Sequence, residues 1–138
     1  MKRILFAICL ILLGLGIVHA QDKQYKVVFD LTSKDTLDQK AVLRWIKEIA
    51  AESLNAKMEV VMYGKGFELV MPERSTMLAD VKEAMKNPNV SFKVCQIAMR
   101  NNKIDKSQLL RGVDTVPDGI YEIYLKQQDH WGYIKVMH

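Results

Sequence analysis

Residues that commonly build metal centres and catalytic triads are scarce in this 138-residue sequence, which contains 2 cysteines and 3 histidines. His130 and His138 are the histidines beyond the first twenty residues, and neither has the ligand spacing of a zinc site. No arrangement of serine, histidine and carboxylate indicates hydrolysis. The 7 glycines include no Walker A loop or dinucleotide fingerprint. We therefore expect neither a metal nor a cofactor.

The one long hydrophobic run lies at the N-terminus. Lys2 and Arg3 precede an apolar stretch over residues 4–18, and Val18-His19-Ala20 places small or short residues where a signal peptidase cleaves. The stretch is shorter than the roughly 20 residues of a membrane-spanning helix. Cys9 lies inside it, which argues against a lipoprotein. We expect residues 1–20 to be a cleaved signal peptide and the protein to be exported, periplasmic or secreted, without a membrane span.

Residues 21–138 would then form one domain of about 118 residues, enough to bury its own core. Removing the leader removes two basic residues and no acidic ones, which leaves 18 basic against 16 acidic residues and a charge of +2. Such a balance gives no electrostatic reason to bind nucleic acid. Cys95 is then the single cysteine in a compartment that favours disulfides. A lone thiol there is buried and inert, reactive, or paired with another molecule.

Apolar patterning predicts strands that alternate with helices. Strand-like runs cover residues 25–31, 58–63, 90–96, 113–116 and 133–137; helical periodicity covers 36–54, 75–86 and 119–128, with shorter helical turns at 97–102 and 105–111. Thr36 and Gln39 have the spacing of a capping box at the start of the first helix. The alternation predicts a single α/β domain with a parallel sheet covered by helices on both faces.

Candidate site residues lie where these strands end, the edge at which open parallel sheets bind ligands. Cys95 comes near the end of the third strand, just before a helical turn, where free N–H groups and the helix dipole favour a reactive thiolate. Arg100, about one turn further along, would add positive charge. The competing interpretation is a structural cysteine, because free cysteine is among the most buried residue types.

Two further loops follow the first two strands. Gly64-Lys65-Gly66 could let backbone N–H groups converge on an anion, with Lys65 supplying charge, but a tight turn explains the same residues. Residues 32–36 are rich in hydroxyl groups and contain no glycine. A helix cap and loop explain them better than a phosphate-binding loop.

With these segments in place, the sequence resembles the DsrE/DsrF-like family of small sulfur-relay proteins from about Tyr25 to Met137. The resemblance is carried by the segments EVVMYGKGFELV, FKVCQIAMRNNKI and GVDTVPDGIYEIYLKQQDHWGYIKV. It implies a three-layer α/β/α domain with a five-stranded parallel sheet, a homotrimer or hexamer, and a cysteine at position 95 that accepts and passes on a persulfide. Members often have histidine where this chain has Tyr63, so the chain lacks that acid–base group.

Two functions follow from these observations. The first is an exported sulfur carrier or transferase, in which Cys95 binds or relays sulfur between donor and acceptor proteins; Arg100, Tyr63, Gly64, Lys65 and Gly66 are the candidate supporting residues. The second is a non-catalytic, oligomeric binding module of the same fold with a buried structural cysteine. Because the better-known relay members are cytoplasmic, an exported copy would need other partners.

Overall fold

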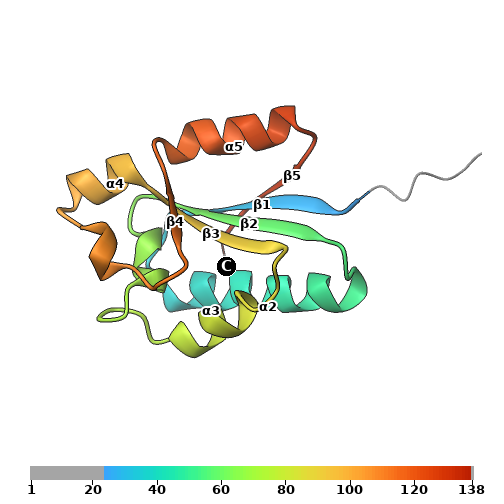
Figure 1. The fold of residues 1–138 in the computed structure, drawn as a ribbon, viewed down its shortest axis with the longest axis horizontal. Coiled ribbons are helices and arrows are strands. Elements are labelled where there is room, and N and C mark those ends of the chain that lie inside the picture. The colour runs from blue at the N-terminus through green and yellow to red at the C-terminus, as the bar shows by residue number, and fades with distance from the viewer. Residues whose placement is uncertain (1–23, 138) are drawn as a thin grey trace, which may run out of the picture.

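The computed structural model describes residues 24–137, which form a five-stranded sheet in the order β4-β3-β2-β1-β5 (Figure 1). The strands are β1 (Lys26–Leu31), β2 (Lys57–Met62), β3 (Val90–Cys95), β4 (Asp114–Val116) and β5 (Gly132–Lys135), and every pairing is parallel. The helices are α2 (Thr36–Glu52), α3 (Leu78–Ala84), α4 (Gln96–Asn101) and α5 (Gly119–Gln128), with 3-10 helices at Gly66–Val70 and Lys106–Gln108. The predicted five-stranded parallel α/β sheet is confirmed.

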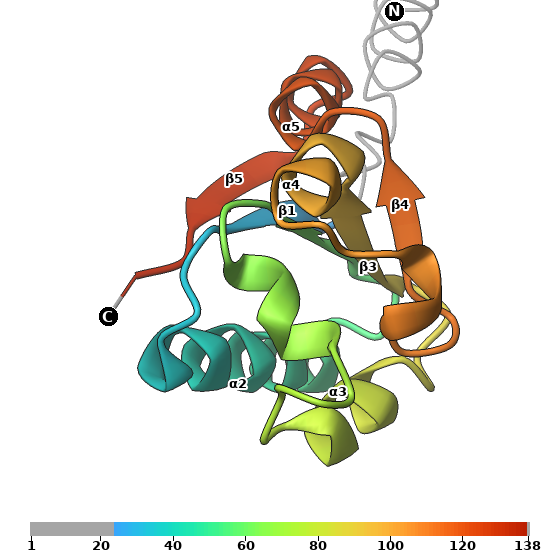
Figure 2. The same cartoon turned by 90° about the vertical axis from the view of Figure 1, so that its left-hand side faces the viewer.

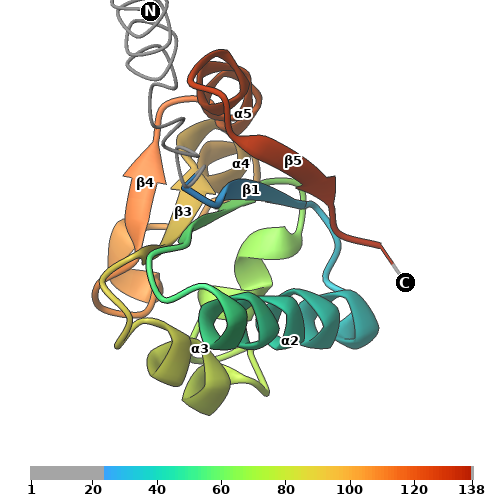
Figure 3. The same ribbon diagram turned by 90° about the vertical axis from the view of Figure 1, so that its right-hand side faces the viewer.

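The domain has three layers, with α2 and α3 on one face of the sheet and α5 on the other (Figures 1 and 2). The chain moves outward from β1 to β4 and then returns to the far side of β1 for β5. Crossovers between parallel strands are right-handed. When the chain reverses the direction in which it crosses the sheet, the connecting helix therefore lies on the face opposite to the earlier helices. Figure 3 shows the same layers from the opposite end. The helix α5 therefore packs on that face, against β1, β2, β3 and β5.

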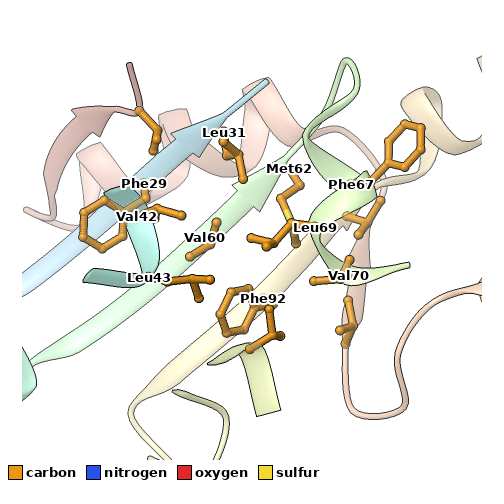
Figure 4. Packing of buried hydrophobic residues seen from close by; sticks show 14 of the residues in the cluster. Phe29, Leu31, Val42, Leu43, Val60, Met62, Phe67, Leu69, Val70 and Phe92 are labelled. Atoms are coloured by element: carbon orange, nitrogen blue, oxygen red, sulfur yellow. The ribbon is translucent and has the colours of Figure 1, made fainter. Parts of the chain in front are cut away.

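The main core lies between the sheet and the layer that contains α2 and α3. Side chains alternate across each strand, so every second residue of β1 and β2 points into this core. The aromatic rings of Phe29 and Trp45 stack there with centroids 6.2 Å apart. Figure 4 shows the core around Phe29, which includes Leu31, Val42, Val60, Met62, Phe67, Leu69 and Phe92. This packing fixes the strand ends at which the candidate site lies.

The opposite face of the sheet, beneath α5, is held largely by ion pairs. Lys126 of α5 binds Glu59 of β2 at 2.9 Å, and Lys93 of β3 lies 3.0 Å from both Glu59 and Glu122. Burial opposes the charge of Lys93, but its hydrogen bonds to Glu122 and Glu59 outweigh that effect and raise its pKa. A small apolar cluster completes the contact, formed by Val28, Val61 and Ile123. The position of α5 thus depends on charged side chains as well as on apolar packing.

The capping box expected at Thr36 and Gln39 is wrong. Asp35 is the N-cap of α2, and its carboxylate accepts a hydrogen bond from the N–H of Leu37 at 2.8 Å. Ser33 supports the same turn by accepting the N–H of Asp35 at 2.9 Å. Aspartate satisfies a free N–H group as threonine would, and its negative charge also favours the helix N-terminus. The preceding loop is therefore the entry to a helix.

Two helices are shorter than their apolar patterns predicted. The N–H of Met77 donates to the hydroxyl of Ser75 at 3.1 Å, and α3 begins after this turn, at Leu78. The helix expected over 105–111 is a 3-10 helix of 3 residues with the reciprocal capping of Asp105 and Gln108. Local side-chain hydrogen bonds explain both differences, because they offer the backbone an alternative to helix.

The expected signal peptide, with Cys9, lies outside the described residues, and so does His138. Within residues 24–137, no helix has the length and apolar character needed to cross a membrane.

Candidate functional site

Cys95 lies where β3 ends and α4 begins, as the sequence predicted. It is the last residue of β3 and the N-cap of α4, with φ −67° and ψ 121°, and its side chain makes no capping hydrogen bond. The thiol residue is 4% exposed. Among the described residues it is the one free cysteine. The strand–helix junction therefore places a lone cysteine at the N-cap position of a helix, at the carboxyl edge of the sheet.

A pocket of about 240 Å³ opens onto Cys95. Three parts of the chain that are distant in sequence form its walls: the exit of β2, the helix α4 and the start of α5. The described residues that line it are Tyr63, Gly64, Cys95, Ile97, Ala98, Asn101, Asn102, Asp118 and Ile120. No lysine or arginine is among them. The low exposure of Cys95 thus coexists with a direct opening toward it.

Gly119 allows α5 to begin directly against the cysteine. A Cβ atom at this glycine would lie 3.1 Å from the Cβ of Cys95, 3.2 Å from Cγ1 of Val61 and 3.4 Å from Cδ1 of Tyr63. Asp118 caps the helix by accepting the N–H of Ile120 at 2.9 Å. In the sequence, the helical periodicity over 119–128 predicted only that a helix starts here. Its second role, as part of the cysteine pocket, depends on the return of the chain across the sheet.

Tyr63 joins the pocket to a buried carboxylate. Its hydroxyl donates to Oδ2 of Asp30 at 3.1 Å, and the hydroxyl of Tyr133 donates to the same oxygen at 2.7 Å. Nζ of Lys135 lies 3.1 Å from both Asp30 oxygens and 3.1 Å from Oγ1 of Thr32. Asp30 is 3% exposed, so these donors supply the hydrogen bonds that water cannot.

Both tyrosines of this cluster remain protonated at neutral pH. Burial, together with the charge of Asp30 and the hydrogen bond to it, raises the pKa of Tyr63 far above its usual value. The hydrogen bond to Asp30, followed by burial, raises the pKa of Tyr133 to about 12. Tyr63 is therefore a neutral wall of the cysteine pocket, and it does not act as a base there.

The sequence analysis missed three members of this cluster: Asp30, Tyr133 and Lys135. A signal for one of them was present, because Asp30 interrupts the otherwise apolar strand VVFDL. A charged residue in a buried strand needs a partner of opposite charge. The identity of that partner could not be read from the sequence, because Lys135 is 105 residues away.

The Gly64-Lys65-Gly66 segment has the geometry of a tight turn. Gly64 has φ +59°, a conformation that glycine adopts readily. The N–H of Lys65 donates to the carbonyl of Thr32 at 2.9 Å, and that of Gly66 donates to the carbonyl of Tyr63 at 2.9 Å. Both N–H groups are therefore engaged and do not converge on an anion. The ammonium of Lys65 instead binds Oδ1 of Asn102 at 2.6 Å, which ties the turn to the end of α4.

Arg100 does not join the site. It lies in the last turn of α4 with an exposed side chain, outside the set of residues that line the pocket. The expected positive charge beside the thiol is therefore absent from the pocket wall. Among the described residues, no group of three or more histidine, cysteine or acidic side chains is placed to hold a metal ion.

Comparisons with known proteins agree with this architecture. A model of the DsrE/DsrF-like family matches residues 26–136. The structure of MTH1491 from Methanobacterium thermoautotrophicum, a protein of unknown function, is similar with a TM-score of 0.76 and 28% identity, over 81% of this chain and 99% of that one. The ychN protein from E. coli has the same fold, with a TM-score of 0.65 and 14% identity over 81% and 98% of the two chains. No curated protein matches the sequence.

Proposed function

The chain belongs to the DsrE/DsrF-like family, and from this membership we propose that it is an exported sulfur carrier in which Cys95 binds or relays sulfur as a persulfide or mixed disulfide. The observation that carries the proposal is the position of Cys95, at a strand–helix junction and open to a pocket at the carboxyl edge of the sheet. The thiolate is the nucleophile in sulfur exchange, and the pocket gives a donor access to this sulfur.

The reaction would be a simple exchange at sulfur. The Cys95 thiolate attacks the terminal sulfur of a donor persulfide, a new S–S bond forms, and the S–S bond of the donor breaks. The electron pair of that bond leaves with the donor thiolate, while the proton stays on the transferred sulfur. No oxidant is consumed, because one persulfide replaces another. A mixed disulfide would form by the same attack on a disulfide, again with release of one thiolate.

The walls of the pocket favour a sulfur donor without strong negative charge. The pocket contains no cationic side chain, and Asp118 carries a carboxylate on its rim. Its volume of about 240 Å³ is below the roughly 300–1,000 Å³ of typical small-molecule sites. A cysteine side chain presented by a partner protein fits this space better than a large ligand. The proposed partners are therefore donor and acceptor proteins.

The low exposure of Cys95 supports one alternative function. At 4% exposure the residue packs with the main core, as a structural cysteine would. In that case the protein is a non-catalytic binding module of the same fold, and the pocket holds a ligand without sulfur exchange. The two functions differ in whether the thiol reacts while the protein is folded.

Thiol labelling distinguishes these functions. Native protein and protein in denaturant are treated with iodoacetamide at neutral pH, and a separate native sample receives a small-molecule persulfide. For a sulfur carrier, native labelling proceeds, and the persulfide adds about 32 Da, one sulfur atom, to Cys95. Cys95→Ser is the matched control, since serine is close in size and should retain the fold while losing both reactions. A thiol that reacts only in denaturant would support the binding module instead.

We also propose that the protein is a homo-oligomer, a trimer or a hexamer. The outer surface of α5 exposes a row of apolar side chains: Ile120 at 65%, Tyr121 at 58%, Tyr124 at 52% and Leu125 at 43%. Tyr121 and Tyr124 stack on each other at 6.0 Å. Contiguous apolar surface of this kind typically marks an interface. Light scattering would test the proposal, and a monomer of about 118 residues at micromolar concentration would contradict it.

Export is proposed from residues 1–20, and residues 21–138 would be the mature domain. Intact-mass measurement of secreted material should show a chain that begins near Gln21. A full-length chain recovered from a membrane fraction would contradict this.

A further inference from the structure

The helices α2 and α3 lie side by side on the face of the sheet opposite α5 (Figure 3). A second hollow is lined by residues of both helices. Its volume is about 500 Å³, twice that of the cysteine pocket. The floor is apolar and is formed by both helices and the start of β3: Leu43, Ile46, Ala50, Met77, Ala84 and Val90. None of these residues has a role in the proposed sulfur chemistry.

The two walls of this groove carry opposite charge. Lys40, Arg44 and Lys47 form the wall on α2, and their spacing of four and three residues places them on one face of the helix. Asp80 and Glu83, three residues apart, form the wall on α3. A row of cations thus faces a row of anions across an apolar floor.

These opposite charges do not close the groove. Arg44 pairs with Glu48 within α2 at 3.6 Å, and Glu83 pairs with Lys86 close to it in sequence. Within residues 24–137, no ion pair joins one wall to the other. The charged walls therefore remain open to groups outside this chain.

We propose that the groove is the docking surface for a second copy of this chain, related by a two-fold axis that lies in the interface and runs along the groove. In a two-fold interface the same patch lies on both partners, so the patch must complement itself. Half a turn about this axis, which is parallel to both helices, turns the second copy over and places α2 of each copy opposite α3 of the other. Each basic wall then faces an acidic wall, and this happens twice. A ligand or partner helix of one charge sign would leave one wall unmatched.

Leu37 supplies an apolar side chain that can enter the partner's groove. It is 53% exposed in the first turn of α2, three residues before Lys40 and therefore on the same face of the helix. Because α2 and α3 connect parallel strands and run in the same direction, the two-fold rotation carries Leu37 toward the N-terminal end of the partner's α3. Met77, the N-cap of α3, lines the groove at that end.

Two charge-reversal variants test this interface. The first is Arg44→Glu with Lys47→Glu, and the second is Asp80→Lys with Glu83→Lys; all four side chains are exposed. Each variant alone should lose two-fold association, with a dissociation constant raised at least about tenfold, because like charges then meet across the interface. An equimolar mixture should recover it, since each variant supplies the wall that the other lacks. Native mass spectrometry would show complexes containing equal numbers of the two variants.

A variant of the α5 surface, Tyr121→Ser with Tyr124→Ser, separates this interface from the assembly proposed through α5. It should leave the two-fold association intact. Circular dichroism checks that each variant is folded, and Arg44→Gln with Lys47→Gln serves as a milder second variant that should weaken association without full loss. The inference is overturned if the reversal variants retain the wild-type assembly, or if folded variants fail to associate when mixed. Labelling of Cys95 in the same samples tests the sulfur function independently.

Discussion

Replacing Tyr133 with phenylalanine removes one hydroxyl group from the buried Asp30 cluster and leaves the ring in place. That hydroxyl donates a 2.7 Å hydrogen bond to Oδ2 of Asp30, which is 3% exposed. A hydrogen bond to a charged group contributes roughly 1.5–3 kcal/mol. Tyr133 is 43% exposed, so water can partly replace it, and Asp30 keeps its contacts with Tyr63 and Lys135. We therefore expect a loss of about 1 kcal/mol in the free energy of unfolding at pH 7.

The pH dependence of this loss is the more specific part of the prediction. The pKa of Tyr133 is raised to about 12 in the folded protein, so its stabilising contribution is fully present below pH 10, the value of the unfolded chain. It is lost as the pH rises from about 10 to about 12, because the unfolded state releases its proton first. The difference in stability between wild type and Tyr133→Phe should therefore shrink over this range.

Urea titrations at pH 8 and pH 11 measure this difference directly. Tyr124→Phe is the matched control, because Tyr124 is 52% exposed on α5 and its hydroxyl has no hydrogen bond among those described. The control should match the wild type within about 0.5 kcal/mol at both values of pH. The reasoning is refuted if Tyr133→Phe is as stable as the wild type at pH 8, or if its deficit is equally large at pH 11.

Three further substitutions test other parts of the structure. Gly66→Ala would place a Cβ atom 2.0 Å from the carbonyl oxygen of Leu31, so the β2 exit must shift; we expect a loss of more than about 2 kcal/mol in thermal or urea unfolding. Gly119→Ala is milder, because its Cβ atom would lie 3.1–3.4 Å from its neighbours and the backbone φ is not strained. We expect a loss of about 1 kcal/mol in the free energy of unfolding. An unchanged melting temperature would argue against tight packing of α5 on the cysteine. Burial opposes the charge of Glu122, but its hydrogen bond to Lys93 outweighs burial and lowers its pKa. The stabilisation of the fold by this carboxylate is therefore present above about pH 4.5 and is lost as the pH falls through the pKa of the folded state. In urea titrations at acidic pH, Glu122→Gln should lose less stability with falling pH than the wild type.

The sequence by itself determined the order of the elements and the class of the fold. Runs of β-branched residues alternate with helical periodicity, and each run is a local property that neighbouring residues fix. Local patterns also predicted that Cys95 lies between a strand and a helix, because the strand pattern over 90–96 is followed directly by the helical pattern over 97–102. Periodicity predicted the helix ends less well. The side chains of Asp35 and Ser75 accept hydrogen bonds from nearby backbone N–H groups, and apolar periodicity does not reveal these bonds.

Only the tertiary structure decided which distant residues meet. Lys135 binds Asp30 across 105 residues of sequence, because β5 returns to lie beside β1. Gly119 lies against Cys95 because the crossover from β4 carries α5 back over the sheet. Arg100, in the last turn of α4, stays outside the pocket. The physical reason is that the burial of a side chain and the identity of its partner depend on how the helices pack on the sheet and on the order of the strands. A charged residue in a buried strand shows that a partner must exist, and the folded sheet determines which one it is.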